Sequence, residues 1–158
     1  MQFLWYALFA VGIVAVDQWT KFLVLEHIPL YGHVDAIPGL FHLTYVRNTG
    51  AAFSAFEGMQ WLFALIFVVL TVAILYEYFK KPLPFTGFER WLIAAIYGGG
   101  VGNMIDWLRM GFVVDMIEVD FMRFAVFNVA DCFITCGSIL LILHLIFFNK
   151  NFWKEEKK

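Results

Sequence analysis

The sequence predicts a mainly α-helical membrane protein in which four transmembrane helices carry a small extracytoplasmic β-sheet and loop subdomain. Hydrophobic residues make up 62% of the 158 residues, and the mean hydropathy is +0.77. Charged residues make up only 15%, against about 25% in soluble domains. Four apolar runs approach the roughly 20 residues that a helix needs to cross a bilayer. We therefore expect one membrane domain over residues 1–158.

The four apolar runs occupy residues 3–25, 61–79, 91–107 and 129–148. The second run carries no charge before its last turn, whereas the third is short and rich in glycine. The glycines of the third run recur at a four-residue spacing, which is typical of closely packed helices. No Gly-Lys-Ser/Thr follows them, as it does in a phosphate-binding loop. A four-helix bundle with one small-residue packing face is predicted.

Lysine and arginine are distributed unevenly between the two sides of these runs, and cytoplasmic loops carry the excess in membrane proteins. Both termini are therefore predicted to be cytoplasmic, with the longer loops, 26–60 and 108–128, outside. The two sets that flank the runs are Lys80, Lys81, Arg90, Lys150, Lys154, Lys157 and Lys158 on the side of the termini, and Arg47, Arg109 and Arg123 on the other.

The two outer loops contain segments with the character of strands. Leu40–Asn48 is rich in aromatic and β-branched residues and follows a Pro-Gly turn, and Phe112–Val119 has the same texture after a glycine. Such patterns predict extended structure. The short apolar stretch Ala51–Glu57 is expected to lie in the membrane interface. A small sheet is thus predicted on the outer surface.

Several classes of function are disfavoured by the composition. The low content of basic residues argues against nucleic-acid binding, and a net charge of −2 indicates no particular partner. Cys132 and Cys136 are too few for a disulfide framework, and their four-residue spacing fits helix packing. Zinc catalysis is disfavoured because the histidines are scattered without a His-Glu-x-x-His pattern. These histidines are His27, His33, His42 and His144.

Charged and amide side chains inside the predicted spans are costly, and such residues usually face the bundle interior and serve a function. Asp17 and Lys21 are one helical turn apart in the order that favours an intrahelical ion pair, so a structural pair is expected. Asn128 and Asp131 have the spacing of an N-cap and the third helical residue. Capping alone is one explanation of these two residues, and a functional site is the other.

Asp115 favours the second explanation, because it is another acid on the same outer side in an apolar segment that needs no cap. Two carboxyl groups a few Å apart do not both ionise, so one holds a proton while the other acts as a base. Asp115 and Asp131 together could activate a water against a peptide carbonyl. Sixteen residues of separation do not establish that they meet.

Five ordered motifs in this chain resemble those of the bacterial prolipoprotein signal peptidases, the type II enzymes. The resemblance covers nearly the whole sequence, and the motifs occur in order on four spans with matching loops. They are Asp17-Gln18-x-x-Lys21, Arg47-Asn48-x-Gly50-Ala51-Ala52-Phe53, Gly102-Asn103-x-x-Asp106, Gly111-x-Val113-Val114-Asp115 and Phe127-Asn128-x-Ala130-Asp131.

The resemblance implies a metal-free and cofactor-free aspartic peptidase of the bacterial cytoplasmic membrane, working as a monomer with its active site toward the outer face. Its partners would be membrane lipid and prolipoproteins, which it cuts before a lipid-modified cysteine. Asp115 and Asp131 match the catalytic dyad of the family. The residues that match the surroundings of the family's site are Asn48, Gly50, Asn103, Asp106, Asn128 and Ala130.

The chain departs from the family pattern at Trp107, where an arginine usually follows the aspartate of the third motif. Because a buried, unpaired carboxylate is costly, we expect Arg109 to supply the missing positive charge to Asp106. Two other functions stay open at this point. One is an ion-coupled transporter that uses Asp17, Asp106 and Asp131 as a proton pathway, and the other is a purely structural membrane partner.

Overall fold

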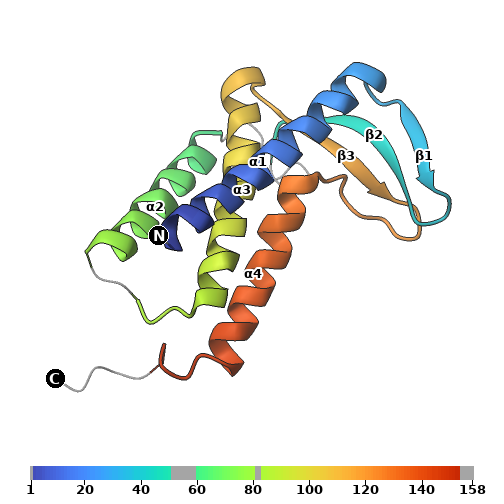
Figure 1. The fold of residues 1–158 in the computed structure, drawn as a ribbon. Helices are drawn as coiled ribbons and strands as arrows, with labels where there is room; N and C mark the ends of the chain where they lie inside the picture. Colours follow the sequence, from blue (N-terminus) through green and yellow to red (C-terminus); the bar gives the residue numbers. More distant parts are fainter. Residues whose placement is uncertain (1, 51–59, 81–82, 154–158) are drawn as a thin grey trace.

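The computed structural model describes residues 2–50, 60–80 and 83–153, so the interfacial segment expected at 51–57 lies outside the described residues. Four helices and a three-stranded sheet account for most of this part of the chain (Figure 1). In chain order they are α1 Gln2–His27, β1 His33–Ile37, β2 Phe41–Asn48, α2 Gln60–Phe79, α3 Gly87–Met110, β3 Val113–Val119 and α4 Val129–Phe147.

The helix boundaries agree with the predicted runs except at α3, which extends beyond the predicted 91–107 at both ends. At its start, the Thr86 side chain accepts a hydrogen bond from the Glu89 N–H, and the Glu89 side chain accepts one from the Thr86 N–H. This reciprocal capping box satisfies two free amides. At its end, Gly111 has φ of 76°, a left-handed conformation that suits glycine. Capping, rather than hydropathy, sets the length of α3.

Two of the helices, α1 and α4, meet a length and hydropathy criterion for a membrane span among the described residues. Residues 64–79 of α2 form a shorter apolar helix. Helix α3 is less apolar than α1, α2 and α4. The prediction of a mainly helical protein with a small sheet is confirmed. The prediction of four transmembrane helices stays a prediction.

Helix α3 lies at the centre and packs against α1 and α4, while α2 lies to one side of it (Figure 1). The glycines of α3 allow this close approach. A Cβ built on Gly98 would lie 2.9 Å from the Ala10 carbonyl oxygen of α1, and one on Gly99 would lie 2.6 Å from the Ala130 carbonyl oxygen of α4. The expected small-residue packing face is therefore present, and it contacts two helices rather than one.

We expect Gly99→Ala to lower the free energy of unfolding by about 1 to 3 kcal/mol, the usual cost of overpacking a tight contact. The added methyl would meet a backbone oxygen of Ala130, which cannot rotate away. Thermal unfolding in detergent measures the change. Gly12→Ala is the matched control, because a Cβ at Gly12 would meet nothing within 4 Å. Equal stability of the two variants would contradict the packing role of Gly99.

The three strands form an antiparallel sheet in the order β1-β2-β3. It extends from the end of the bundle at which α1 and α3 end and α4 begins (Figure 1). Its inner face packs on the end of α1, where Val24 and Ile28 contact Tyr45, Val114 and Met116. The predicted strands at 40–48 and 112–119 are confirmed. Strand β1 was not predicted. All of its residues are exposed, and a strand with no buried face has no alternation of apolar and polar residues in its sequence.

Pairing of β2 with β3 places Val46 opposite Asp115 and Asn48 opposite Val113. The register shifts between Leu43 and Val46, as at a β-bulge, which bends a strand and re-aims its side chains. The sheet therefore brings the end of β2 and the acid of β3 together, next to the first turn of α4.

Candidate active site

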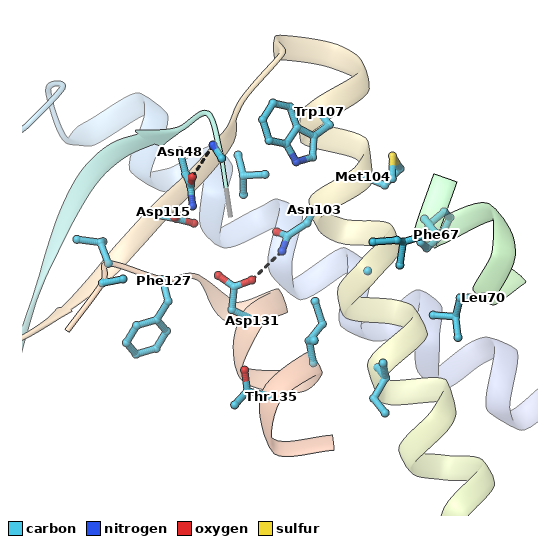
Figure 2. Close-up of a pocket in the computed structure, with 18 of the residues that line it drawn as sticks. Asn48, Phe67, Leu70, Asn103, Met104, Trp107, Asp115, Phe127, Asp131 and Thr135 are labelled. Carbon is cyan, nitrogen blue, oxygen red and sulfur yellow. Dashed lines mark hydrogen bonds between the residues drawn. The ribbon is translucent and has the colours of Figure 1, made fainter. Parts of the chain in front are cut away.

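A pocket of about 490 Å³ lies between the β2–β3 ends of the sheet and helices α2, α3 and α4. Its walls are mostly apolar, and Figure 2 shows Phe67, Trp107 and Phe127 at its edge. The polar atoms are concentrated on one side, where two carboxyl groups and two amides line it. These four residues are Asn48, Asn103, Asp115 and Asp131.

The structure brings Asp115 of β3 and Asp131 of α4 to the same pocket (Figure 2). Asn128 connects them. Its Nδ2 donates to Asp115 Oδ1 at 2.7 Å, and its backbone N–H donates to Asp131 Oδ2 at 3.2 Å. The Asn128 side-chain oxygen accepts from the Asp131 N–H at 2.9 Å. The capping explanation of Asn128 and Asp131 is confirmed. The functional explanation stays a prediction, and Asn128 contacts both acids of the pocket.

Three asparagine amides direct N–H groups at the two acids, and each amide is held in that orientation by a second contact. Asn48 donates to Asp115 Oδ2 at 2.8 Å, while its oxygen accepts from the Gly50 N–H. Asn103 donates to Asp131 Oδ1 at 2.8 Å. With the contacts of Asn128, all four carboxyl oxygens accept a hydrogen bond, an arrangement that favours at least one ionised acid.

Asp115 is 2% exposed, and its pKa reflects this. Burial, with the neighbouring charge of Asp131, raises the pKa of Asp115 to about 7, against the opposing hydrogen bonds from Asn48 and Asn128. A carboxyl with such a pKa keeps its proton to near-neutral pH while a second acid nearby ionises. This is the electrostatic condition for an acid and a base made from two identical side chains.

A second group of buried charges lies behind the acids. The expected pair is present, with Lys21 Nζ 2.9 Å from Asp17 Oδ2, but Lys21 points inward and also lies 2.9 Å from Asp106 Oδ2. Asp106 accepts from the Val114 N–H at 3.1 Å, next to Asp115 in β3. Asp17 accepts from the Ala130 N–H at 3.0 Å, next to Asp131 in α4. These carboxylates hold the two chain segments that carry the acids.

The expectation that Arg109 is the cation for Asp106 is wrong. Within the described residues, the ion-pair partner of Asp106 is Lys21, and Arg109 is exposed. The spacing of three residues along α3 was compatible with a pair. However, Asp106 turns toward α1, where a buried ammonium and the Gln18 amide, 2.9 Å from Asp106 Oδ1, already meet its carboxylate.

Gln18 is also a member of the network, although the sequence analysis gave it no role within its motif. Its Nε2 also donates to the Gly102 carbonyl at 3.0 Å. An amide beside an acid within an apolar span was the available signal. Gly102 itself allows α1 to approach, because a Cβ there would lie 2.5 Å from Asp17 Oδ2.

Comparison with known proteins identifies the family of this arrangement. The family description "Signal peptidase (SPase) II" matches residues 9–147. A lipoprotein signal peptidase of Streptococcus pyogenes is 42% identical over 144 residues, covering 91% of this chain and 90% of that protein. The chain belongs to the signal peptidase II family.

Other relatives agree with this membership. A lipoprotein signal peptidase of Streptococcus agalactiae is 43% identical over 148 residues, covering 91% of this chain and 88% of its own length. A solved bacterial membrane enzyme superposes with a TM-score of 0.82 at 32% identity, covering 97% of this chain and 93% of that chain. A second one gives a TM-score of 0.80 at 31% identity. As a signal peptidase II family member, the protein is a protease.

Proposed function

We propose that the protein is an intramembrane aspartic endopeptidase that removes signal peptides from prolipoproteins carrying a diacylglyceryl-modified cysteine. The observation that carries the proposal is the pair Asp115 and Asp131, which face one pocket while both carboxyl groups are held by asparagine amides. The lipoprotein signal peptidases among its relatives support the choice of substrate. Residues 1–158 then form one peptidase domain, which we propose works as a monomer.

In the proposed reaction, a water between the acids attacks the carbonyl carbon of the bond before the lipidated cysteine. Asp131 serves as the base and takes a proton from the water as its oxygen bonds to carbon. Asp115 serves as the acid, since its pKa of about 7 lets it hold a proton at neutral pH. It stabilises the developing oxyanion by hydrogen bonding. The intermediate then collapses, the C–N bond breaks, and the leaving amine receives a proton from the dyad.

A membrane setting is supported by the distribution of side chains. Within the described residues, the large side chains that are fully buried are almost all polar. Many Phe, Leu, Ile and Trp side chains face outward instead. This is the reverse of a soluble domain and suits a bundle whose solvent is lipid. We therefore infer four membrane-crossing helices in a bacterial cytoplasmic membrane. The buried set is Lys21, Glu89, Val114, Asn128, Asp17, Asp106 and Asp115.

We infer from the lysine and arginine distribution that both termini are cytoplasmic and that the sheet and the dyad face outward. In a chain freed of Cys132 and Cys136, a cysteine placed at the exposed Asp35 should react with an impermeant thiol reagent in intact cells. Cysteines placed at Pro84 and Trp153, which are also exposed, should react only after lysis. Labelling at Pro84 or Trp153 in intact cells would contradict the inferred orientation.

The lipid of the substrate is expected to be essential. Burial of acyl chains contributes about 0.8 kcal/mol per CH₂, which anchors the scissile bond at the membrane without extensive side-chain recognition. The test uses purified protein in detergent with lipidated and unlipidated forms of one precursor at matched concentration. We expect the lipidated form to be cleaved and the unlipidated form to be a poor substrate. No cleavage of either form would contradict the proposed function, and equal cleavage would contradict the role of the lipid.

A further inference from the structure

The buried ion pairs of Lys21 are linked to the dyad through Asn103, which contacts both Lys21 and Asp131. Lys21 is 2% exposed, and an ammonium has three N–H groups to donate. Two of them serve Asp17 and Asp106, each at 2.9 Å. The third reaches Oδ1 of Asn103 at 2.9 Å, and Nδ2 of the same amide donates to Asp131. A continuous chain of hydrogen bonds thus runs from Lys21 to the dyad (Figure 2 shows its last link).

We infer that Lys21 is a positioning residue of the peptidase, which acts through Asn103 to aim an N–H donor at Asp131. The inference rests on the proposed dyad mechanism. An asparagine amide has one donor end and one acceptor end. Both groups that face Asn103 Oδ1 are donors, the Lys21 ammonium and the Asn128 amide at 3.1 Å. A flipped Asn103 would set N–H against N–H there, so the amide keeps its donor end toward Asp131.

The charge of Lys21 also acts on the dyad. The charged side chains joined in this cluster are Asp17 and Lys21 from α1, Asp106 from α3, Asp115 from β3 and Asp131 from α4. Among the described residues of this cluster, Lys21 is the one cation beside four carboxyl groups, and it contacts two of them. The positive charge of Lys21 lowers the pKa of Asp115, against the larger effects of burial and Asp131. Its removal should move the ionisation of the dyad to higher pH.

Replacement of Lys21 alone would leave two buried carboxylates without their cation, which is strongly destabilising. The test therefore neutralises a pair, by Asp17→Asn with Lys21→Met, called the Met variant below. The net charge of the buried cluster is then unchanged, and Asp106 keeps its hydrogen bonds from the Gln18 amide and the Val114 N–H. The amide introduced by Asp17→Asn keeps an oxygen for the Ala130 N–H. A companion variant, Asp17→Asn with Lys21→Gln, called the Gln variant, restores an uncharged donor near Asn103. Glu77→Gln with Arg90→Met is the matched control, because Arg90 pairs with Glu77 at 2.9 Å in another part of the bundle.

The Met variant should lose about tenfold to 100-fold in kcat, as expected for loss of a hydrogen bond that involves a charged group, with little change in KM. The limbs of its pH–rate profile should shift to higher pH. The Gln variant should recover part of kcat but not the original profile. Asn103→Ala should cost less in the Met variant than in the wild type, because Lys21 acts through Asn103. The Glu77→Gln with Arg90→Met control should keep the wild-type profile.

The outcomes separate this inference from the function beneath it. Suppose that Asp115→Asn and Asp131→Asn are inactive while the folded Met variant keeps wild-type kcat and pH profile. Lys21 then only neutralises its neighbours, and the inference fails alone. Normal cleavage by the two dyad variants would instead overturn the proposed mechanism. Equal losses in the Met and Gln variants, in proportion to their thermal stability, would also overturn the positioning role.

Discussion

Asp115→Asn and Asp131→Asn should each reduce cleavage of a lipidated precursor by about 10³-fold or more, the scale of loss expected when a general acid or base is removed. Either change removes one half of a pair that shares a proton, so the double variant should be no worse than the singles. Single-turnover cleavage by purified protein measures both effects. Asn keeps the size and shape of Asp and one acceptor oxygen, so folding should be retained although one of the two hydrogen bonds to each carboxyl group is lost.

Stability provides the control for these variants. Because burial raises the pKa of Asp115 to about 7, the folded protein binds this proton more tightly than the unfolded chain. The stability contributed in this way is fully present at low pH and is lost as pH rises through about 7. Asp115→Asn should therefore unfold at a temperature no lower than wild type at pH 8. Asp35→Asn, an exposed exchange on β1, should leave activity unchanged. Normal turnover by either well-folded dyad variant would refute the assignment.

Asn128→Asp should produce the second largest loss, about 10²-fold or more, because it adds a third carboxylate to the dyad and removes its donor. An aspartate oxygen can still accept from the Asp131 N–H and cap α4. The other oxygen would lie where Nδ2 now donates to Asp115 at 2.7 Å and to Asn103 at 3.1 Å. The measurement is the pH–rate profile, whose alkaline limb should move upward as the pKa of Asp115 rises further.

Asn128→Ser separates the cap from the site. Serine is also a good N-cap, so the first turn of α4 should keep its stability. The variant lacks Nδ2 and adds no charge, so its activity should fall by about tenfold to 100-fold, less than that of Asn128→Asp. If Asn128→Asp loses stability and activity in step while Asn128→Ser keeps full activity, Asn128 serves only as a cap.

The helices and two of the three strands could be predicted because each rests on a local pattern. The apolar runs, the Pro-Gly turn before β2 and the glycine spacing of α3 are all visible within a few residues. Strand β1 could not be predicted in this way, because all five of its residues are exposed. The start of α3 was also missed, although Thr86 and Glu89 carry a capping-box signature.

The sequence by itself determined the helical framework and the intrahelical pair Asp17 and Lys21, because hydropathy and one-turn spacing are local properties. The candidate acids Asp115 and Asp131 followed from the ordered motifs that resemble the family. Only the tertiary structure decided which groups contact each other. Asp106 pairs with Lys21, 85 positions earlier in the chain, rather than with Arg109 on its own helix. In a buried site a carboxylate binds the cation that desolvation and packing bring to it, whatever the distance between the two along the chain.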